Sequence, residues 1–147
     1  MVIKKALVTG GAGFIGSTLV DELIKQGIHV VVLDDLSTGK QENINPKAKF
    51  INCDISCTPY EDILPYFIEV DVVFHTAAKA RVQPSIDDPI TYNQSNVNGT
   101  LNILYAAYKA GVKRVVYSAS SSAYGDTAIF PTPESAATSP MSPYGLQ

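Results

Sequence analysis

The 147-residue sequence predicts an α/β domain in which helices cover both faces of a doubly wound parallel sheet. Short apolar runs that suit buried strands alternate along the chain with longer segments of helical periodicity. A glycine-rich turn joins the first strand to the first helix, and polar residues gather where the later strands end. Because β-α-β crossovers are right-handed, we expect the carboxyl ends of the strands to meet at a single edge of the sheet.

The first strand and the first helix enclose the glycine-rich turn. An apolar run over residues 3–8 leads to Gly10, Gly13 and Gly16, and a helix with an apolar stripe over residues 15–24 follows. Gly10 suits a tight turn, Gly13 lets backbone N–H groups approach a phosphate, and Gly16 lets the helix pack close to the sheet. The helix N-terminus directs unpaired N–H groups and the positive end of its dipole at an anion. The turn therefore predicts a seat for the pyrophosphate of a dinucleotide.

A second strand over residues 28–33 ends at Asp34, roughly twenty residues after Gly16. A carboxylate at this offset meets the ribose hydroxyls of an adenosine, and it would repel a 2′-phosphate. No arginine stands next to Asp34 to accommodate such a phosphate. The sequence therefore predicts NAD, and not NADP, as the cofactor.

The next part of the chain continues the alternation of strands and helices. The pattern predicts strands over residues 49–53, 71–75 and 113–118, a short helix over residues 59–67, and a loop around residues 84–89. Pro59 suits the first turn of the short helix, because its missing N–H has no partner there. Each predicted strand is thus followed by a crossing segment, as a parallel sheet requires.

The last predicted helix covers residues 97–110, and the chain ends in a segment of different composition. The helix carries apolar residues at positions 97, 101, 104, 105 and 108, and Gly111 closes it. Segment 126–143 is rich in Pro, Ser and Thr, which predicts an ordered crossing loop or lid in preference to a disordered tail. With neither a repeat nor a linker, residues 1–147 are expected to form one dinucleotide-binding domain.

Small and polar residues occupy the ends of the predicted strands, where doubly wound sheets bind their ligands. These positions are residues 10–16, 34–35, 54–55, 76–80 and 118–122. Ala77 and Ala78 would leave room for a cofactor beside the fourth strand, and Asp54 would accept a hydrogen bond from an adenine amino group.

The composition argues against other classes of partner. Eleven Lys and Arg residues against 14 Asp and Glu residues give a net charge of −3, and no basic cluster is present, so we expect no binding of nucleic acid. The sequence has neither an apolar span long enough for a membrane nor a leader segment, so we expect a cytoplasmic protein without membrane contact.

The cysteines and histidines do not predict a metal site. Cys53 and Cys57 have a spacing that also suits a disulfide or a metal pair, but a metal needs more ligands than two cysteines. Neither His29 nor His75 completes a zinc spacing. His75, at the end of the fourth strand, is expected to be a structural imidazole in preference to a catalytic base.

The chain resembles the extended short-chain dehydrogenase/reductase family along its whole length, and within it the NAD-dependent nucleotide-sugar epimerases that act on UDP-glucose or UDP-N-acetylglucosamine. The resemblance rests on the ordered stretches 9–16, 33–39, 73–78, 96–100, 118–125 and 142–145. It implies an NAD-binding Rossmann fold. The cofactor-binding residues expected from the motifs and the resemblance together are Gly10, Gly13, Phe14, Ile15, Gly16, Asp34, Asp35, Ser37, Thr38, Gly39, Asp54, Ile55, Thr76, Ala77, Ala78, Ala80, Asn96, Ser118 and Tyr144.

The resemblance also implies a mechanism, with Ser120 and Tyr144 as the catalytic residues. Tyr144 would remove a proton from a sugar hydroxyl while hydride passes to NAD, and Ser120 would hydrogen-bond that hydroxyl. Return of the hydride to the other face of the rotated keto sugar inverts the carbon without net oxidation. The family's dehydratases carry acidic residues where this chain has Ser121 and Ser122, and a serine is too weak an acid for an elimination, so epimerisation is favoured.

The family motif continues from Tyr144 to a lysine, whose position would follow Gln147 directly. In the family this ammonium holds the nicotinamide ribose and lowers the pKa of the tyrosine. The resemblance places the remaining strands and a smaller C-terminal substrate domain after this point too. We therefore expect a domain that is incomplete at its C-terminal end, without the substrate domain, and that binds NAD without epimerising a sugar.

Three interpretations of the chain remain open at the level of sequence. It is the cofactor part of an epimerase, a naturally short NAD-binding module without catalysis, or one chain of a two-chain enzyme whose partner supplies the lysine and the sugar-binding half. The family's next helix would pack beside the helix over residues 97–110. Without it the apolar stripe of that helix prefers a partner, so we expect a homo-oligomer.

Overall fold

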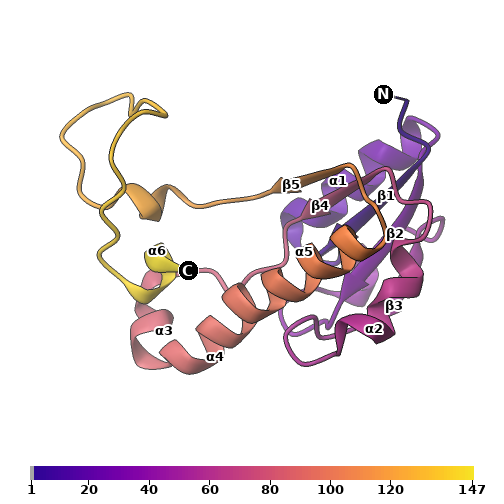
Figure 1. Ribbon diagram of the computed structural model, residues 1–147, viewed down its shortest axis with the longest axis horizontal. Helices are drawn as coiled ribbons and strands as arrows, with labels where there is room; N and C mark the ends of the chain where they lie inside the picture. The colour runs from indigo at the N-terminus through magenta and orange to yellow at the C-terminus, as the bar shows by residue number, and fades with distance from the viewer. Residues whose placement is uncertain (1) are drawn as a thin grey trace.

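Five parallel strands form one sheet in the order β3-β2-β1-β4-β5, and helices lie on both of its faces (Figure 1). The computed structural model describes residues 2–147. The strands are β1 (Lys5–Thr9), β2 (His29–Asp34), β3 (Lys49–Asn52), β4 (Val72–His75) and β5 (Arg114–Tyr117). The helices are α1 (Phe14–Lys25), α2 (Tyr60–Ile63), α3 (Val82–Asp87), α4 (Pro89–Asn93), α5 (Gly99–Lys109) and α6 (Pro143–Leu146). Shorter turns are η1 (Gln41–Asn43), η2 (Leu64–Phe67), η3 (Gln94–Asn98) and η4 (Ser121–Tyr124).

This topology confirms the predicted doubly wound sheet. Every predicted strand is present, and its ends agree with the prediction to within about two residues. The strand order reverses at β1, which pairs with β2 on one side and with β4 on the other. Ligands of such sheets bind outside the carboxyl ends of the strands at this switch point.

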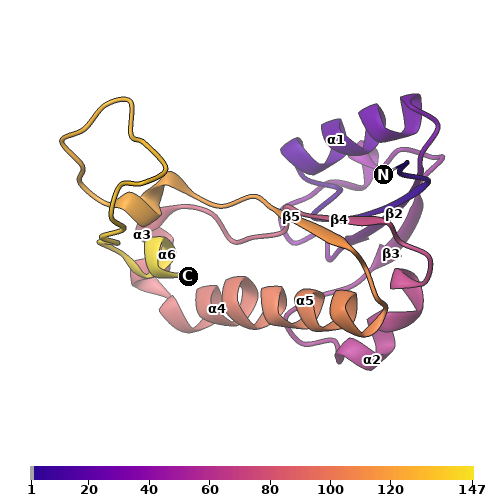
Figure 2. The same ribbon diagram turned by 45° about the horizontal axis from the view of Figure 1, so that its top comes forward.

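A hydrophobic core lies on each face of the sheet, because successive side chains of a strand point to opposite faces. Ala6 and Val8 of β1 pack with Val20 of α1 on one face. Leu7, between them, packs with Phe67 and Ile103 on the other face, which α2 and α5 cover. Figure 2 shows α1 and α5 on opposite sides of the sheet. The strands are apolar on both faces for this reason, as the uninterrupted apolar runs of the sequence indicated.

The segment predicted as a loop around residues 84–89 is the main correction to the expected elements. It contains the end of α3 and the start of α4. Asp88 accepts a hydrogen bond from the Thr91 backbone N–H at 3.1 Å, and Pro89 occupies the first helical position. The residues that signalled a loop therefore start a helix, because Asp is a favoured N-cap and Pro fits the first turn.

The helix predicted over residues 97–110 belongs to a longer rod of α4, η3 and α5, which Figure 1 shows running from α3 to the sheet. The turn η3 has π geometry. The buried face of α5 contains Gly99, Ile103, Ala106 and Ala107. The apolar stripe that predicted the helix, at positions 97, 101, 104, 105 and 108, lies on its exposed face.

The last part of the chain extends away from the sheet. Residues 126–142 form a loop without helix or strand, and the Ser139 N–H donates to the Ala123 carbonyl at its base, at 3.0 Å. Strand β5 forms one edge of the sheet, and Val116 and Tyr117 on it are exposed. Among residues 2–147, no helix combines the length and the apolar character that crossing a membrane requires.

We predict that Phe67→Ala lowers the free energy of unfolding by about 3–5 kcal/mol, because it opens a cavity in the core under α5. Phe67 is 0% exposed, whereas its neighbour Ile68 is 58% exposed. Ile68→Ala is therefore the matched control, with an expected change of at most about 0.5 kcal/mol. Urea denaturation followed by circular dichroism measures both, and similar losses for the two variants would contradict the assignment of this core.

Candidate functional site

A cavity of about 320 Å³ lies at the carboxyl edge of the sheet, where β1, β2 and β4 end. It is lined by Gly10, Gly13, Phe14, Ile15, Gly16, Leu33, Asp34, Asp35, Ser37, Thr38, Cys53, Asp54, Ile55, Thr76, Ala77, Ala78, Lys79, Ala80 and Ser95. The structure thus brings together most of the residues that the sequence singles out for cofactor binding. Gly39, Asn96, Ser118 and Tyr144 are not part of the lining.

The glycine turn forms the floor of the cavity at the start of α1. Gly10 has a φ of 69°, and a Cβ there would lie 2.8 Å from the backbone of Ala77. A Cβ on Gly16 would overlap the Gly10 carbonyl oxygen. Both positions therefore require glycine, one for conformation and one for the close packing of helix on turn. Gly13 is the N-cap of α1 and has no side chain to cap it, so the first N–H groups of the helix remain available to an anion.

Asp34 joins this turn to the end of β2. Its buried carboxylate accepts hydrogen bonds from the Ala12 N–H at 2.9 Å and from the Leu36 N–H at 2.8 Å. An ionised carboxylate has about four lone-pair sites, so two remain for a ligand's hydroxyl groups. The next residue, Asp35, stabilises the loop after β2, because its carboxylate accepts hydrogen bonds from the Ser37 N–H and the Ser37 hydroxyl. The hydrogen bonds of Asp34 and Asp35 thus order the part of the cavity wall that follows β2.

Asp54 and Ile55 form the far wall of the cavity, after β3. Partial burial by itself raises the pKa of Asp54. Hydrogen bonds from the Ser56 hydroxyl and the Ser56 N–H together lower it by more than burial raises it, so the pKa of Asp54 lies below its usual value. Asp54 therefore stays an ionised acceptor. This geometry is compatible with the expected contact to an adenine amino group.

The wall that follows β4 is held from behind by Asn96. This buried amide accepts a hydrogen bond from the Lys79 N–H at 2.8 Å and donates to the Lys79 carbonyl at 3.0 Å. Asn96 belongs to the π turn η3, a geometry that often occurs at functional sites. It acts on the cavity through the backbone of Lys79, which the sequence analysis did not include among the cofactor-binding residues. In the sequence, the feature that could have indicated Lys79 is its position between Ala78 and Ala80, two residues that were expected to bind the cofactor.

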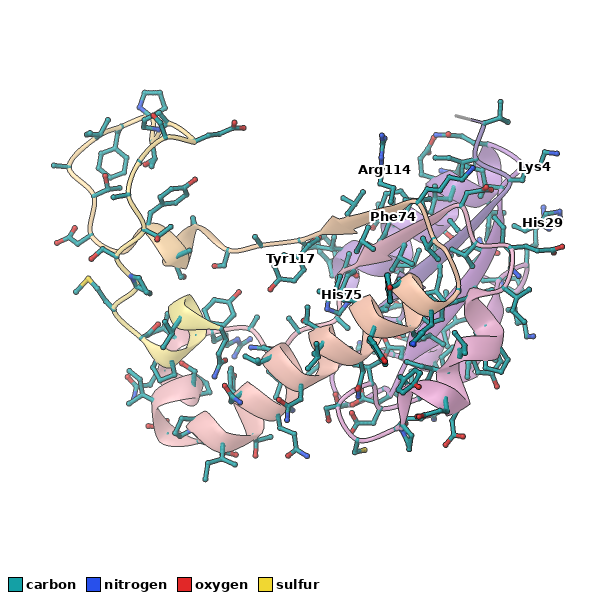
Figure 3. All side chains as sticks on the ribbon, viewed as in Figure 1. Lys4, His29, Phe74, His75, Arg114 and Tyr117 are labelled. Carbon is teal, nitrogen blue, oxygen red and sulfur yellow. The ribbon has the colours of Figure 1, made fainter. Side chains whose placement is uncertain are left out.

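His75 lies at the end of β4, 1% exposed, with both ring nitrogens hydrogen-bonded. Its Nδ1 lies 2.6 Å from Thr9 Oγ1 and its Nε2 lies 2.8 Å from Thr100 Oγ1. The ring stacks on Tyr117 of β5 with a centroid distance of 5.6 Å, and Figure 3 shows the two side chains at the ends of their strands. Burial lowers the pKa of His75 to about 4, so the imidazole is neutral at pH 7.

Ser120 and Tyr144 lie on two elements that pack together beyond the cavity. Ser120 is the N-cap of η4, where its hydroxyl accepts from the Ser122 N–H at 3.2 Å. The Tyr144 N–H donates to the Ser85 hydroxyl at 3.1 Å, which ties α6 to α3. A Cβ on Gly145 would lie 2.6 Å from the Ser122 carbonyl oxygen, so α6 approaches η4 closely at a glycine. Ser118, between β5 and η4, donates its N–H to the His75 carbonyl.

Both cysteines are free thiols without a disulfide, Cys53 in the cavity wall and Cys57 at the surface. Within residues 2–147, no cluster of three or more His, Cys, Asp or Glu side chains has a geometry that would hold a metal ion.

Comparison with known proteins supports a dinucleotide site. Residues 6–147 match the sequence profile of the NAD dependent epimerase/dehydratase family. A putative UDP-glucose 4-epimerase of Methanocaldococcus jannaschii is 44% identical over 141 residues, which cover 95% of this chain and 46% of the relative. The chain therefore spans about half the length of the curated relatives it matches.

Solved structures agree with the sequence comparison. The structure of UDP-glucose 4-epimerase from Thermotoga maritima with UDP-glucose has a TM-score of 0.91 and 42% identity over 97% of this chain and 47% of that one. The structure of UDP-glucose 4-epimerase from Thermus thermophilus in complex with NAD has a TM-score of 0.88 and 38% identity over 97% of this chain and 46% of that one.

The depressed pKa of His75 predicts a stability that depends on pH. The unfolded chain binds a proton at this residue below its ordinary pKa of 6.5, but the folded chain does so only near 4. The stabilisation is therefore complete above pH 6.5 and is lost as the pH falls toward 4. Between pH 6.5 and pH 5, we expect the free energy of unfolding to fall by about 1.5 kcal/mol in urea denaturation. His29→Gln is the control and should keep this dependence, whereas equal stability at both pH values would contradict a neutral, buried His75.

Proposed function

The chain belongs to the NAD dependent epimerase/dehydratase family, and from this premise we propose that it is the NAD-binding portion of a nucleotide-sugar 4-epimerase. The observation that supports this proposal most is that the glycine turn and the Asp34 carboxylate line the same cavity. Its two ends offer the two kinds of group that a dinucleotide requires, N–H donors for phosphate and a carboxylate for ribose. Relatives and solved structures named UDP-glucose 4-epimerase support the choice of reaction.

NAD fits the groups that line the cavity. The first turn of α1 supplies backbone N–H groups, and the absence of a Cβ at Gly13 lets a pyrophosphate approach them. Asp34 keeps lone pairs free beside its two backbone partners and would accept from the adenosine ribose hydroxyls. The same carboxylate excludes a 2′-phosphate, because two anions would then share one buried site. Bound NAD supplies a hydride acceptor and donor for a sugar carbon.

Ser120 and Tyr144 are proposed as the groups that handle the proton of the sugar hydroxyl. Tyr144 would take the proton, and Ser120 would orient the hydroxyl through a hydrogen bond. The close packing of α6 on η4 supports this pairing, since it brings together the elements at which Tyr144 and Ser120 lie. Ser121 and Ser122 follow Ser120 in η4, and neither is acidic enough to release a leaving hydroxyl, which favours epimerisation over dehydration.

The exposed face of α5 supports a homo-oligomer. Leu101 and Tyr108 on this face are 63% and 75% exposed, and Val97, Leu104 and Tyr105 complete the stripe. Contiguous apolar surface of this kind is typical of an interaction site. We expect sedimentation at micromolar concentration to give a mass above that of one chain, and a monomeric mass would count against this part of the proposal.

We predict saturable binding of NAD⁺ in calorimetric titration of the purified chain, and much weaker binding of NADP⁺. Asp34→Ala removes a charged acceptor of ribose hydroxyls and should weaken NAD⁺ binding roughly tenfold to a hundredfold. Asp34→Asn keeps one acceptor but not the charge, so it should reduce the preference for NAD⁺ over NADP⁺. Asp62→Ala, at an exposed position outside the cavity, is the matched control. Absence of binding by the unchanged chain would refute the proposed function.

The purified 147-residue chain is predicted to show no turnover of UDP-glucose or UDP-N-acetylglucosamine. The lysine of the family motif would follow Gln147, and Tyr144 sits in a final helix of four residues. A helix of that length is marginal by itself, and in a preparation of these 147 residues alone the tyrosine would not have the ammonium that makes it an efficient base in the family. A coupled assay that detects the epimerised sugar tests this, and measurable turnover by the isolated chain would overturn the prediction.

A further inference from the structure

His75 stands in a chain of hydrogen bonds that closes on itself behind the cavity. The Ala77 N–H donates to Thr9 Oγ1 at 3.2 Å, and Thr9 Oγ1 lies 2.6 Å from His75 Nδ1. His75 Nε2 lies 2.8 Å from Thr100 Oγ1, and the Thr100 hydroxyl donates to the Asn96 carbonyl at 2.5 Å. The Asn96 side-chain amide then accepts a hydrogen bond from the Lys79 N–H and donates one to the Lys79 carbonyl. Lys79 and Ala77 belong to the same wall of the cavity, so the ring is complete.

The hydroxyl groups give this ring one direction. A threonine hydroxyl has a single hydrogen, and that of Thr100 is directed at the Asn96 carbonyl. Thr100 Oγ1 can therefore only accept from His75, which requires the hydrogen to sit on Nε2. His75 Nδ1 is then the acceptor of the Thr9 hydroxyl, and Thr9 Oγ1 in turn accepts from the Ala77 N–H. The other neutral tautomer would leave the buried Nε2 without a donor, which is costly at a site with 1% exposure.

From this geometry we infer that His75, as the neutral Nε2–H tautomer, is a positioning residue that sets the Ala77–Lys79 wall of the cofactor cavity through Thr9 on one side and through Thr100 and Asn96 on the other. The π turn contributes because it places the Asn96 amide toward Lys79 while the Asn96 carbonyl meets the Thr100 hydroxyl. His75 touches no ligand and transfers no proton. The inference rests on the proposed function only in naming NAD as the ligand of this wall.

The ring also explains how one imidazole joins distant parts of the chain. Thr9 ends β1, His75 ends β4, and Thr100 lies in the first turn of α5. The three elements also share one apolar core through Leu7, Val73 and Ile103, and the ring adds a polar contact among them at the carboxyl edge. A change at Thr100 should therefore reach Ala77 without any direct contact between the two residues.

The test compares Thr100→Val, which keeps the side-chain shape but removes the hydroxyl, with Thr100→Ser, which keeps the hydroxyl. Without ligand, amide hydrogen exchange at Ala77 and Lys79 should be roughly tenfold faster in Thr100→Val and close to the unchanged protein in Thr100→Ser. NAD⁺ affinity should fall roughly threefold to tenfold in Thr100→Val alone. Thr132→Val removes the same kind of hydroxyl from the loop over residues 126–142 and is the matched control, with neither change expected.

Nitrogen-15 NMR of the unchanged protein measures the tautomer directly and does not depend on any variant folding. A proton on Nε2 of His75 at neutral pH supports the inference, and a proton on Nδ1 overturns it. Exchange rates at Ala77 and Lys79 that are equal in Thr100→Val and Thr100→Ser also overturn it, even if Thr100→Val lowers the melting temperature. An unchanged protein that binds no NAD⁺ refutes the proposed function instead, and the exchange rates and the tautomer then decide the positioning role.

Discussion

The close fit of the glycine turn between the ends of β2 and β4 is the constraint on which the rest of the structure depends. The Gly10 N–H donates to the Leu33 carbonyl at 2.8 Å, and the α-carbon of Gly10 faces the backbone of Ala77 with no room for a side chain. The turn thus spans the point where the strand order reverses, and β1 can reach α1 only through it. A side chain at Gly10 would push the turn away from the backbone that follows β4, and this would disturb the strand ends, the start of α1 and the cavity together.

Polar residues at the strand ends hold the site from within the fold. Thr9, Asp34, His75 and Asn96 are all buried, and each is hydrogen-bonded to backbone or to another of these groups. Buried polar groups without partners would destabilise the chain by an amount comparable to a lost hydrogen bond each. Some of their partners, Ala12, Leu36 and Lys79, lie on loops, so the bonds that satisfy the buried groups also order the loops around the cavity. Stability and site geometry therefore come from one set of contacts.

The sequence predicted the sheet, the glycine turn and most of the cavity, because these depend on local patterns. Apolar runs indicated strands, and the offset from Gly16 to Asp34 indicated the ribose end of the site. The residues that it did not place depend on contacts far along the chain. Asn96 meets Lys79 through a π turn, which has no pattern in sequence, and Cys53, which follows β3, lines the same cavity as Ser95 of η3. In α5, the strongest apolar periodicity marked the exposed face, since small residues at Gly99, Ala106 and Ala107 form the buried one.

The reversal of strand order at β1 also has a consequence for the order of folding events. Thr9 and His75 lie 66 positions apart in the sequence, whereas the partners that β1 meets in β2 lie much nearer along the chain. Closing the longer loop costs more chain entropy, so β1 pairs with β4 late relative to its pairing with β2. On a ribosome, the first strand therefore waits with one edge unpaired until residue 75 has emerged. The glycine turn, although it is encoded at the very start of the chain, gains its close packing against Ala77 only after that point.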